Sequence, residues 1–218
     1  MVLEKFKHFF RNEKIEENIN KTTADHEEAM ESNITVGTEL TPNPNALKFI
    51  VNITVKKTGN STYRSPTECE SNPLALALFK VRGVDQIHIF DNVITVSKFN
   101  YQEWSDVEQE LVTIIKNLIP SHDSDYFDPD PEADRRRNLP NDLKEIELIL
   151  DKTIRPGLQA DGGDIQTITY KENILVIRYQ GACGTCPSST TGTLEAIKGI
   201  LRDEYNPKID VYIEPAIY

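Results

Sequence analysis

Between residues 41 and 119, the spacing of apolar residues changes from strand-like to helix-like and back. Three runs are rich in β-branched and aromatic residues, which favour strands, and two carry apolar residues three or four positions apart, which favours helices. These runs predict strands at 47–55, 86–90 and 93–98 and helices at 74–81 and 107–118. We therefore expect a small α+β domain over residues 41–119, with helices on one face of an antiparallel sheet.

Turn and capping residues mark the ends of these elements. A Ser-Asn-Pro sequence before Leu74 is a helix-start signal, and Gly83 is expected to end that helix. Asp91 and Asn92 tolerate the positive φ of a tight turn, which predicts a hairpin between the last two strands. A loop is expected around residues 59–60.

Residues 141–218 carry a second pattern of the same kind. Apolar residues at helical spacing begin after Asn141, a candidate helix cap, and Pro156 is expected to kink or close the first helix. The pattern predicts helices at 143–158 and from near 188 to 205, strands at 165–170, 174–179 and 209–213, and a turn at the DGGD sequence of 161–164. We expect a second α+β domain, whose antiparallel or mixed sheet has helices on one face.

The remaining segments are polar. Residues 1–40 are rich in Glu, Lys, Asn and Thr and are interpreted as a flexible N-terminal extension. Leu3, Phe6 and Phe10 share one helical face, which leaves open a helix that docks on a partner. Residues 120–140 combine prolines and acidic residues, which predicts a flexible linker. The expected architecture is two small domains that move independently.

Composition and charge narrow the class of protein. Hydrophobic residues make up 38% of the chain and charged residues 27%, and 18 consecutive apolar residues occur nowhere, so we expect neither a transmembrane helix nor a membrane partner. The net charge of -11 repels phosphate backbones, so nucleic acid is not an expected partner. Three cysteines do not form a disulfide framework, and the acidic N-terminus lacks an apolar signal region. We therefore predict a cytoplasmic location.

Cys183 and Cys186 carry the strongest chemical signal. They lie in GACGTCPSST, residues 181–190, between a predicted strand and a predicted helix start. A helix N-terminus favours thiolate over thiol, and the small neighbouring residues allow backbone amides or a second protein surface to come close. The Gly, Thr and Ser neighbours provide no apolar packing, so burial of the pair is not expected. A CxxC motif by itself serves zinc, thiol exchange and iron–sulfur chemistry alike.

Ligand counting separates these three chemistries. A structural zinc site needs four nitrogen or sulfur ligands, whereas residues 141–218 contain two Cys and no His. A thioredoxin-like protein carries its CxxC early in the domain, whereas the chain ends at residue 218, soon after Cys186. Four Cys thiolates hold a [4Fe-4S] cluster, and two chains supply four. A cluster shared by a dimer is favoured, and a dithiol oxidoreductase that uses the same pair is the alternative.

The longer motifs resemble those of the NifU-like (Nfu) iron–sulfur cluster scaffold and carrier family. RPGLQADGGDI at 155–165 and GACGTCPSSTTGTLEAIKGIL at 181–201 resemble its C-terminal domain. TPNPNALKF at 41–49, NPLALALFKVRGV at 72–84 and NVITVSK at 92–98 resemble the N-terminal domain that accompanies it.

The resemblance implies a carrier of a [4Fe-4S] cluster bound by Cys183 and Cys186 of two chains. Upstream cluster assembly proteins and acceptor apo iron–sulfur proteins are the implied partners, and the loaded form is a homodimer. Separation of the two cysteine loops would expose the cluster to acceptor thiolates. This exchange needs no general acid or base, so we expect a carrier and not an enzyme.

Other chemical groups are interpreted as structural. Cys69 lies in a polar stretch and is expected to be an incidental loop or helix-start thiol. The acids of the DGGD sequence at 161–164 could bind Mg²⁺ or Ca²⁺, but a sharp turn is the preferred interpretation. His88 is expected to face solvent or a covering helix, and Trp104 is expected to anchor the start of a helix.

Overall fold

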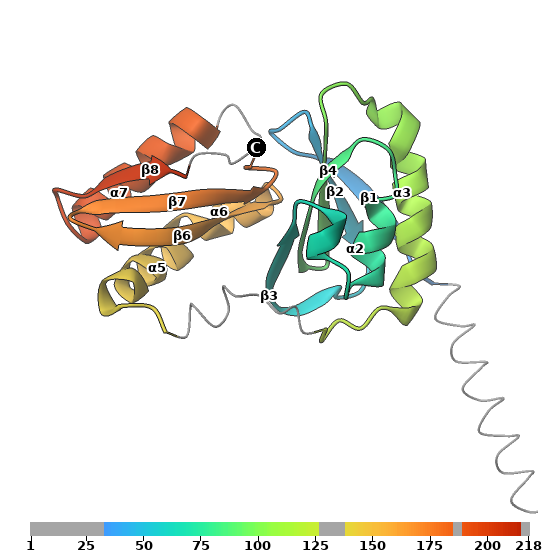
Figure 1. The fold of residues 1–218 in the computed structure, drawn as a ribbon, viewed down its shortest axis with the longest axis horizontal. Coiled ribbons are helices and arrows are strands. Elements are labelled where there is room, and N and C mark those ends of the chain that lie inside the picture. Colours follow the sequence, from blue (N-terminus) through green and yellow to red (C-terminus); the bar gives the residue numbers. More distant parts are fainter. Residues whose placement is uncertain (1–32, 127–137, 185–188, 215–218) are drawn as a thin grey trace, which may run out of the picture.

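A computed structural model describes residues 33–126, 138–184 and 189–214. The helix considered at Leu3 to Phe10, most of the expected N-terminal extension, the middle of the expected linker and Cys186 lie outside these ranges. The described residues form two α+β units that lie side by side (Figure 1). The expected fold class, two sheets each with helices on one face, is confirmed.

The N-terminal unit is a five-stranded antiparallel sheet in the order β1-β2-β5-β4-β3. The strands are β1 (Val36–Leu40), β2 (Ala46–Val51), β3 (Lys56–Tyr63), β4 (Val84–Asp91) and β5 (Val93–Lys98). Two helices, α2 (Pro73–Leu78) and α3 (Trp104–Leu118), cover one face, and short 3-10 turns lie at η1 (Pro66–Glu68) and η2 (Ile119–Ser121) (Figure 1).

Period-two alternation gives this sheet two different faces. The side chains directed at the helices are apolar and fully buried, and they include Phe49, Ile87 and Ile94. Each such side chain contributes about 1.5–3 kcal/mol through burial. Gln86, His88, Thr95 and Ser97 alternate with these residues on β4 and β5 and therefore lie on the opposite face. These polar side chains are also buried, because the second unit covers them.

Some elements of the N-terminal unit differ from those predicted. β1 begins before residue 41, where the folded unit was expected to start. The loop expected around residues 59–60 is wrong, because both residues lie within β3, next to a β-bulge where Gly59 has φ +67°. Helix α2 ends at Leu78 and not at Gly83. The predicted helix start is confirmed, since the Asn72 side chain accepts a hydrogen bond from the Ala75 amide at 3.1 Å.

The C-terminal unit has a three-stranded mixed sheet in the order β6-β7-β8. β6 and β7 form an antiparallel hairpin, and β8 joins β7 in parallel. Its elements are α5 (Asn141–Thr153), α6 (Arg155–Ala160), β6 (Gly163–Lys171), β7 (Ile174–Gly181), the π-helical turn η3 (Ser189–Thr193), α7 (Leu194–Glu204) and β8 (Asp210–Ile213). Apolar residues of the three α-helices and the sheet form one core.

Two capping details of this unit test the sequence prediction. The predicted interruption near Pro156 is confirmed, because α5 and α6 are separated at Ile154 and Pro156 lies in the first turn of α6. The predicted cap at Asn141 is wrong. Asn141 is already helical, and Pro140 holds the cap position without a side-chain hydrogen bond.

The first residues of the expected linker lie against the N-terminal sheet. The Tyr126 hydroxyl donates to Ser61 Oγ at 3.1 Å, and Lys56 Nζ lies 4.0 Å from the centroid of the Tyr126 ring. Lys57 pairs with Asp125. This part of the chain is therefore attached to β3 up to residue 126.

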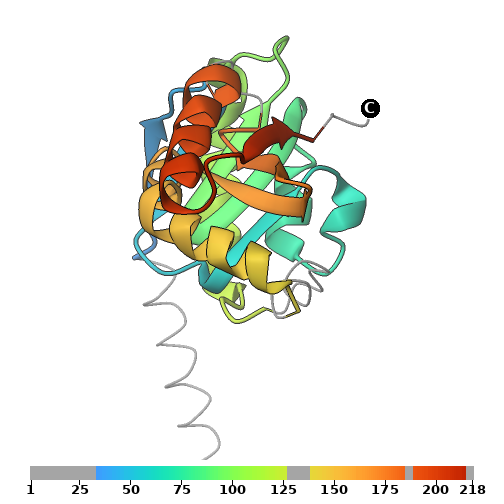
Figure 2. The ribbon, with the colours of Figure 1, turned by 90° about the vertical axis from the view of Figure 1, so that its left-hand side faces the viewer.

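The two units contact each other through the polar face of the N-terminal sheet. Figure 2 shows the C-terminal unit in front of that sheet, and Figure 1 shows α3 on the sheet's opposite side. The end of the hairpin that precedes Cys183 points at β4 and β5 (Figure 1). Independent domains were expected, whereas the structure places this end of one unit on the sheet of the other. None of the helices in the described ranges has the length and apolar character of a membrane span.

Candidate functional site

Cys183 lies two residues beyond β7, in a turn held by backbone hydrogen bonds. The Gly184 amide donates to the Gly181 carbonyl at 3.0 Å, and the Ala182 amide donates to the Gly162 carbonyl at 3.0 Å. The turn therefore joins the end of β7 to the start of β6. Cys186, the second candidate ligand, lies outside the described residues, so only the first cysteine of the pair is placed.

Two glycines allow the backbone to pass closely around the Cys183 turn. A Cβ on Gly163 would lie 2.4 Å from Cys183 Sγ. Gly181 has φ +59°, and a Cβ there would lie 2.5 Å from the Gly162 carbonyl oxygen. Both distances are below any real Cβ contact, so glycine is needed at 163 beside the sulfur and at 181 where the turn passes the Gly162 carbonyl.

Cys183 is buried, contrary to the expectation from its polar neighbours. It is 6% exposed and belongs to the apolar core of the C-terminal unit, near Tyr179. Burial, and to a smaller extent the charge of the Cys183 thiolate, raises the pKa of the Tyr179 hydroxyl. The prediction failed because the turn after β7 places the sulfur against Gly163 at the start of β6, a contact that the composition around the CxxC motif does not reveal.

The helix after the cysteines begins with an unusual turn. Helical structure is described from Ser189, close to the expected start near 188. The first five residues form the π-helical turn η3, and regular α-helix begins only at Leu194. Single π-helical turns of this kind occur often at functional sites.

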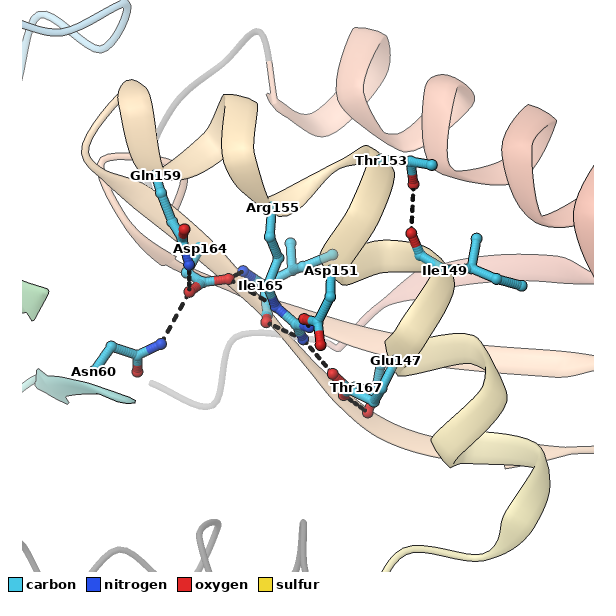
Figure 3. Close-up of polar contacts among 10 residues, drawn as sticks. All are labelled: Asn60, Glu147, Ile149, Asp151, Thr153, Arg155, Gln159, Asp164, Ile165 and Thr167. Atoms are coloured by element: carbon cyan, nitrogen blue, oxygen red, sulfur yellow. Dashed lines mark hydrogen bonds and ion pairs between the residues drawn. The ribbon is translucent and has the colours of Figure 1, made fainter. Parts of the chain in front are cut away.

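A buried arginine holds the start of β6 in place (Figure 3). Arg155 is 3% exposed, and its Nε donates to Asp164 Oδ1 at 3.1 Å and its Nη2 to Glu147 Oε2 at 2.5 Å. A further ion pair joins it to Asp151, and Nη2 also donates to the Ile165 carbonyl at 3.2 Å. Burial lowers the pKa of Arg155, but the three carboxylates outweigh it and raise the pKa overall.

This arginine cluster connects α5, α6 and β6 and was not recognised from the sequence. Its signal was present in the RPGLQADGGDI motif, which holds both Arg155 and Asp164. Glu147 lies eight residues before Arg155, outside this motif, and no motif of its own marks it. It also accepts from Thr167 Oγ1 at 2.5 Å, which extends the cluster further along β6.

The preferred interpretation of the DGGD sequence as a turn is confirmed. Asp161 and Gly162 form the turn, with φ +79° at Gly162, and Gly163 and Asp164 begin β6. Asp164 uses its carboxylate within the fold, as an acceptor for Arg155, for Gln159 Nε2 at 3.1 Å and for the Ile165 amide at 2.7 Å. Its role is to join α6 to β6.

The remaining candidate groups lie elsewhere. His88 does not face solvent or a covering helix as expected. It is 2% exposed between the two units, and burial lowers its pKa to about 4. The prediction for Trp104 is confirmed, since it begins α3 and its Nε1 donates to the Pro44 carbonyl at 3.0 Å.

Cys69 lies in a loop directly after η1, as expected, but its side chain is not in polar surroundings. It is fully buried in the N-terminal core, whereas Cys183 belongs to the C-terminal core. Its Sγ lies 3.5 Å from the Pro66 carbonyl oxygen. Within the described ranges, no three His, Cys, Asp or Glu side chains come together as a metal-binding group.

Comparisons with known proteins match both units. A family model described as "Scaffold protein Nfu/NifU N terminal" matches residues 36–122, and one described as "NifU-like domain" matches residues 146–212, which include both cysteines of the CxxC motif. The chain belongs to the Nfu family. The resemblance inferred from the motifs is thus confirmed over both domains.

Several curated relatives align with most of this chain. Proteins of Drosophila persimilis and Drosophila erecta, each named "NFU1 iron-sulfur cluster scaffold homolog, mitochondrial", are 33% and 34% identical to it, over 80% of this chain and 63% and 62% of their own length. The chain thus spans a little under two thirds of these relatives. A solution structure of a NifU-like protein from Saccharomyces cerevisiae is 22% identical, with a TM-score of 0.40 over 44% of this chain and 87% of that one.

Proposed function

We propose that this Nfu chain is an iron–sulfur cluster scaffold and carrier. Two chains bind one [4Fe-4S] cluster as cargo through Cys183 and Cys186 of each and pass it to apo-proteins. The observation that carries the proposal is the position of Cys183, in a glycine-lined turn at the end of the C-terminal unit and within the segment that matches the NifU-like domain.

The chemistry of transfer follows from the shared ligand set. Each chain contributes two thiolates, so a cluster between two chains has the four that a cubane requires. Moving the two turns apart frees coordination sites on iron, and acceptor thiolates then replace Cys183 and Cys186 stepwise. Proton transfer by an acid or base is not needed, so we class the protein as a carrier and not an enzyme.

The proposed partners are upstream cluster assembly proteins, apo iron–sulfur proteins and a second copy of this chain. The proposed compartment is the cytoplasm or another reducing compartment, which keeps both thiols reduced. The names of the curated relatives place those proteins in mitochondria. Cell fractionation of the tagged chain decides between the two locations.

Anaerobic reconstitution with ferrous iron and sulfide tests the proposal. We expect a brown protein with about four irons per two chains. Cys183→Ser and Cys186→Ser are expected to abolish the colour and the bound iron. Cys69→Ser is the matched control, because the same change in the N-terminal core leaves both proposed ligands in place. Iron bound at wild-type level by the Cys183→Ser and Cys186→Ser variants would contradict the proposal.

The alternative, a dithiol oxidoreductase, predicts a different result. In that case the colourless, metal-free protein reduces protein disulfides with turnover, and both serine variants at the CxxC motif lose that activity. We expect no turnover in an insulin-reduction assay.

A further inference from the structure

The polar face of the N-terminal sheet is covered by the cysteine end of the C-terminal unit. Four side chains form a polar patch there: Gln86, His88, Thr95 and Ser97. They are two cross-strand pairs, with Gln86 opposite Ser97 and His88 opposite Thr95. Each is at most 7% exposed. A sheet face with these polar groups is typical of a surface that meets water, so its burial requires an explanation.

Glycines on the other side allow the close approach. A Cβ on Gly162 would lie 2.8 Å from Thr95 Oγ1, and a Cβ on Gly181 would lie 3.1 Å from His88 Cδ2. A Cβ on Gly184 would lie 3.4 Å from Gln86 Oε1. Glycines before and after Cys183 therefore pack directly on the polar patch.

Hydrogen bonds between described residues cross from one unit to the other around this contact. Asn43 Nδ2 donates to the Ala182 carbonyl at 2.9 Å, and Lys48 Nζ donates to the Ala160 carbonyl at 2.7 Å. Asn60 Nδ2 donates to Asp164 Oδ2 at 2.9 Å. Ala182, next to Cys183, and the two sides of the DGGD turn, at Ala160 and Asp164, are thus hydrogen-bonded to the N-terminal unit.

The contact is nevertheless poorly satisfied at its centre. In the described part of the chain, five buried side-chain atoms have no hydrogen-bond partner, and four belong to the polar patch. The five are Gln86 Oε1, His88 Nε2, Thr95 Oγ1, Ser97 Oγ and Gln180 Oε1. Buried polar atoms of native proteins are normally paired, and water would satisfy these if the units separated. The arrangement has the character of a reversible contact.

We propose that the polar patch is a docking surface for the Cys183 turn of the same chain, occupied in the metal-free protein and vacated when that turn meets a second copy. The second half rests on the proposed function, since only a cluster shared by two chains requires the turn to face its twin. Gln86, His88 and Thr95 pack against the glycines beside Cys183, and a twin turn that shares a cluster must come equally close to them. Docking and cluster binding therefore compete.

A bulky residue in the patch tests the docking in the metal-free full-length chain. Thr95→Arg places a long side chain where Gly162 packs, while Thr58→Arg makes the same change at an exposed position of β3 and serves as the control. We expect wild type and Thr58→Arg to scatter X-rays as a compact particle whose domains tumble together in amide relaxation. Thr95→Arg is expected to increase the radius of gyration and to give each domain a shorter correlation time.

A second variant covers the case in which Thr95→Arg disturbs the sheet. Asn43 Oδ1 accepts a hydrogen bond from the Asn45 amide at 3.0 Å, and an aspartate oxygen can still accept it. Asn43→Asp removes the amide group that donates to the Ala182 carbonyl. It should also loosen the contact. Independent tumbling in the wild type, or compact behaviour of both variants, overturns the proposal.

Cluster loading separates the two halves of the proposal. A docked fraction of about 90% lowers the apparent affinity for the cargo about tenfold, so Thr95→Arg should load at correspondingly lower iron and sulfide. A loaded wild-type dimer whose domains remain docked overturns the release. If none of these proteins binds a cluster, the proposed function fails, while the docking is still decided by the metal-free measurements.

Discussion

Arg155 shows, at the residue scale, how a buried charge positions the cysteine end of the C-terminal unit. It connects Glu147 on α5 with Asp164 at the start of β6, and it lies inside a motif that the sequence already marked. The motif identified the family, but the ion cluster could not be derived from it. Glu147 stands eight residues before Arg155 in an ordinary helical pattern, and only the fold brings the three side chains together.

Replacing this arginine should selectively destabilise the C-terminal unit. Arg155→Met leaves Glu147 and Asp164 buried without their cation, which costs about 3–5 kcal/mol of unfolding free energy. We expect urea denaturation followed by circular dichroism to show an earlier transition, while the fluorescence of Trp104, in the N-terminal unit, shifts much less. Arg82→Met, at an exposed site, is the control and should change stability by less than about 0.5 kcal/mol. If both variants unfolded at the same urea concentration, the ion pairs of Arg155 would contribute little to the stability of the C-terminal unit.

At the scale of elements, strongly periodic segments were predictable and polar ones were not. Helix α3 and the β4–β5 hairpin follow apolar patterns, and both were predicted, with Asp91 at φ 49° in the turn. Strands β1 and β3 were missed because neither carries an apolar run. β3 reads KKTGNSTY, and its neighbours in the sheet, not its own side chains, make it a strand.

The close approach of β6 to the Cys183 sulfur can be tested by substitution at Gly163, the first residue of the strand. Gly163→Ala puts a methyl group 2.4 Å from Cys183 Sγ, so the sulfur or the strand has to move, at a cost of about 1–3 kcal/mol. We expect lower stability of the C-terminal unit and less iron per chain after reconstitution. Gly199→Ala is the control, because nothing lies within 4 Å of that Cβ and alanine favours the helix by up to about 1 kcal/mol. Normal iron binding by Gly163→Ala would contradict this role.

At the scale of the whole molecule, the contact between the units was not predictable from the sequence. The alternation along β4 and β5 identifies a polar face but does not show what covers it, and the acidic segment after residue 120 was interpreted as a tether for independent domains. The glycines of the DGGD and GACG sequences were recognised as turn and close-approach residues. Their packing against His88 and Thr95 depends on residues from a distant part of the chain.

Acid should weaken this contact. In the docked chain burial lowers the pKa of His88 to about 4, below its ordinary value of 6.5, with Asp164 raising it and Arg64 lowering it further. The docked form therefore binds fewer protons than the separated form, so the free energy that favours docking is largest above pH 6.5 and decreases as the pH falls toward 4. The loss is at most about 1.4 kcal/mol per pH unit.

Amide relaxation of the metal-free chain between pH 7.5 and 5 measures this effect, in a range where ordinary carboxylates remain ionised. We expect increasingly independent tumbling of the two units as the pH falls. His88→Gln removes the titrating group and should flatten the dependence. An identical pH response in the two proteins would assign the effect to other groups.

The central claim is that Cys183 and Cys186 form half of a cluster site that a second chain completes. The most direct test is the native mass of the anaerobically loaded protein, recorded together with its iron and sulfide content. We expect a species of two chains with one four-iron cluster, and single chains once the cluster is removed by a chelator. A single chain that retains a complete cluster would contradict it.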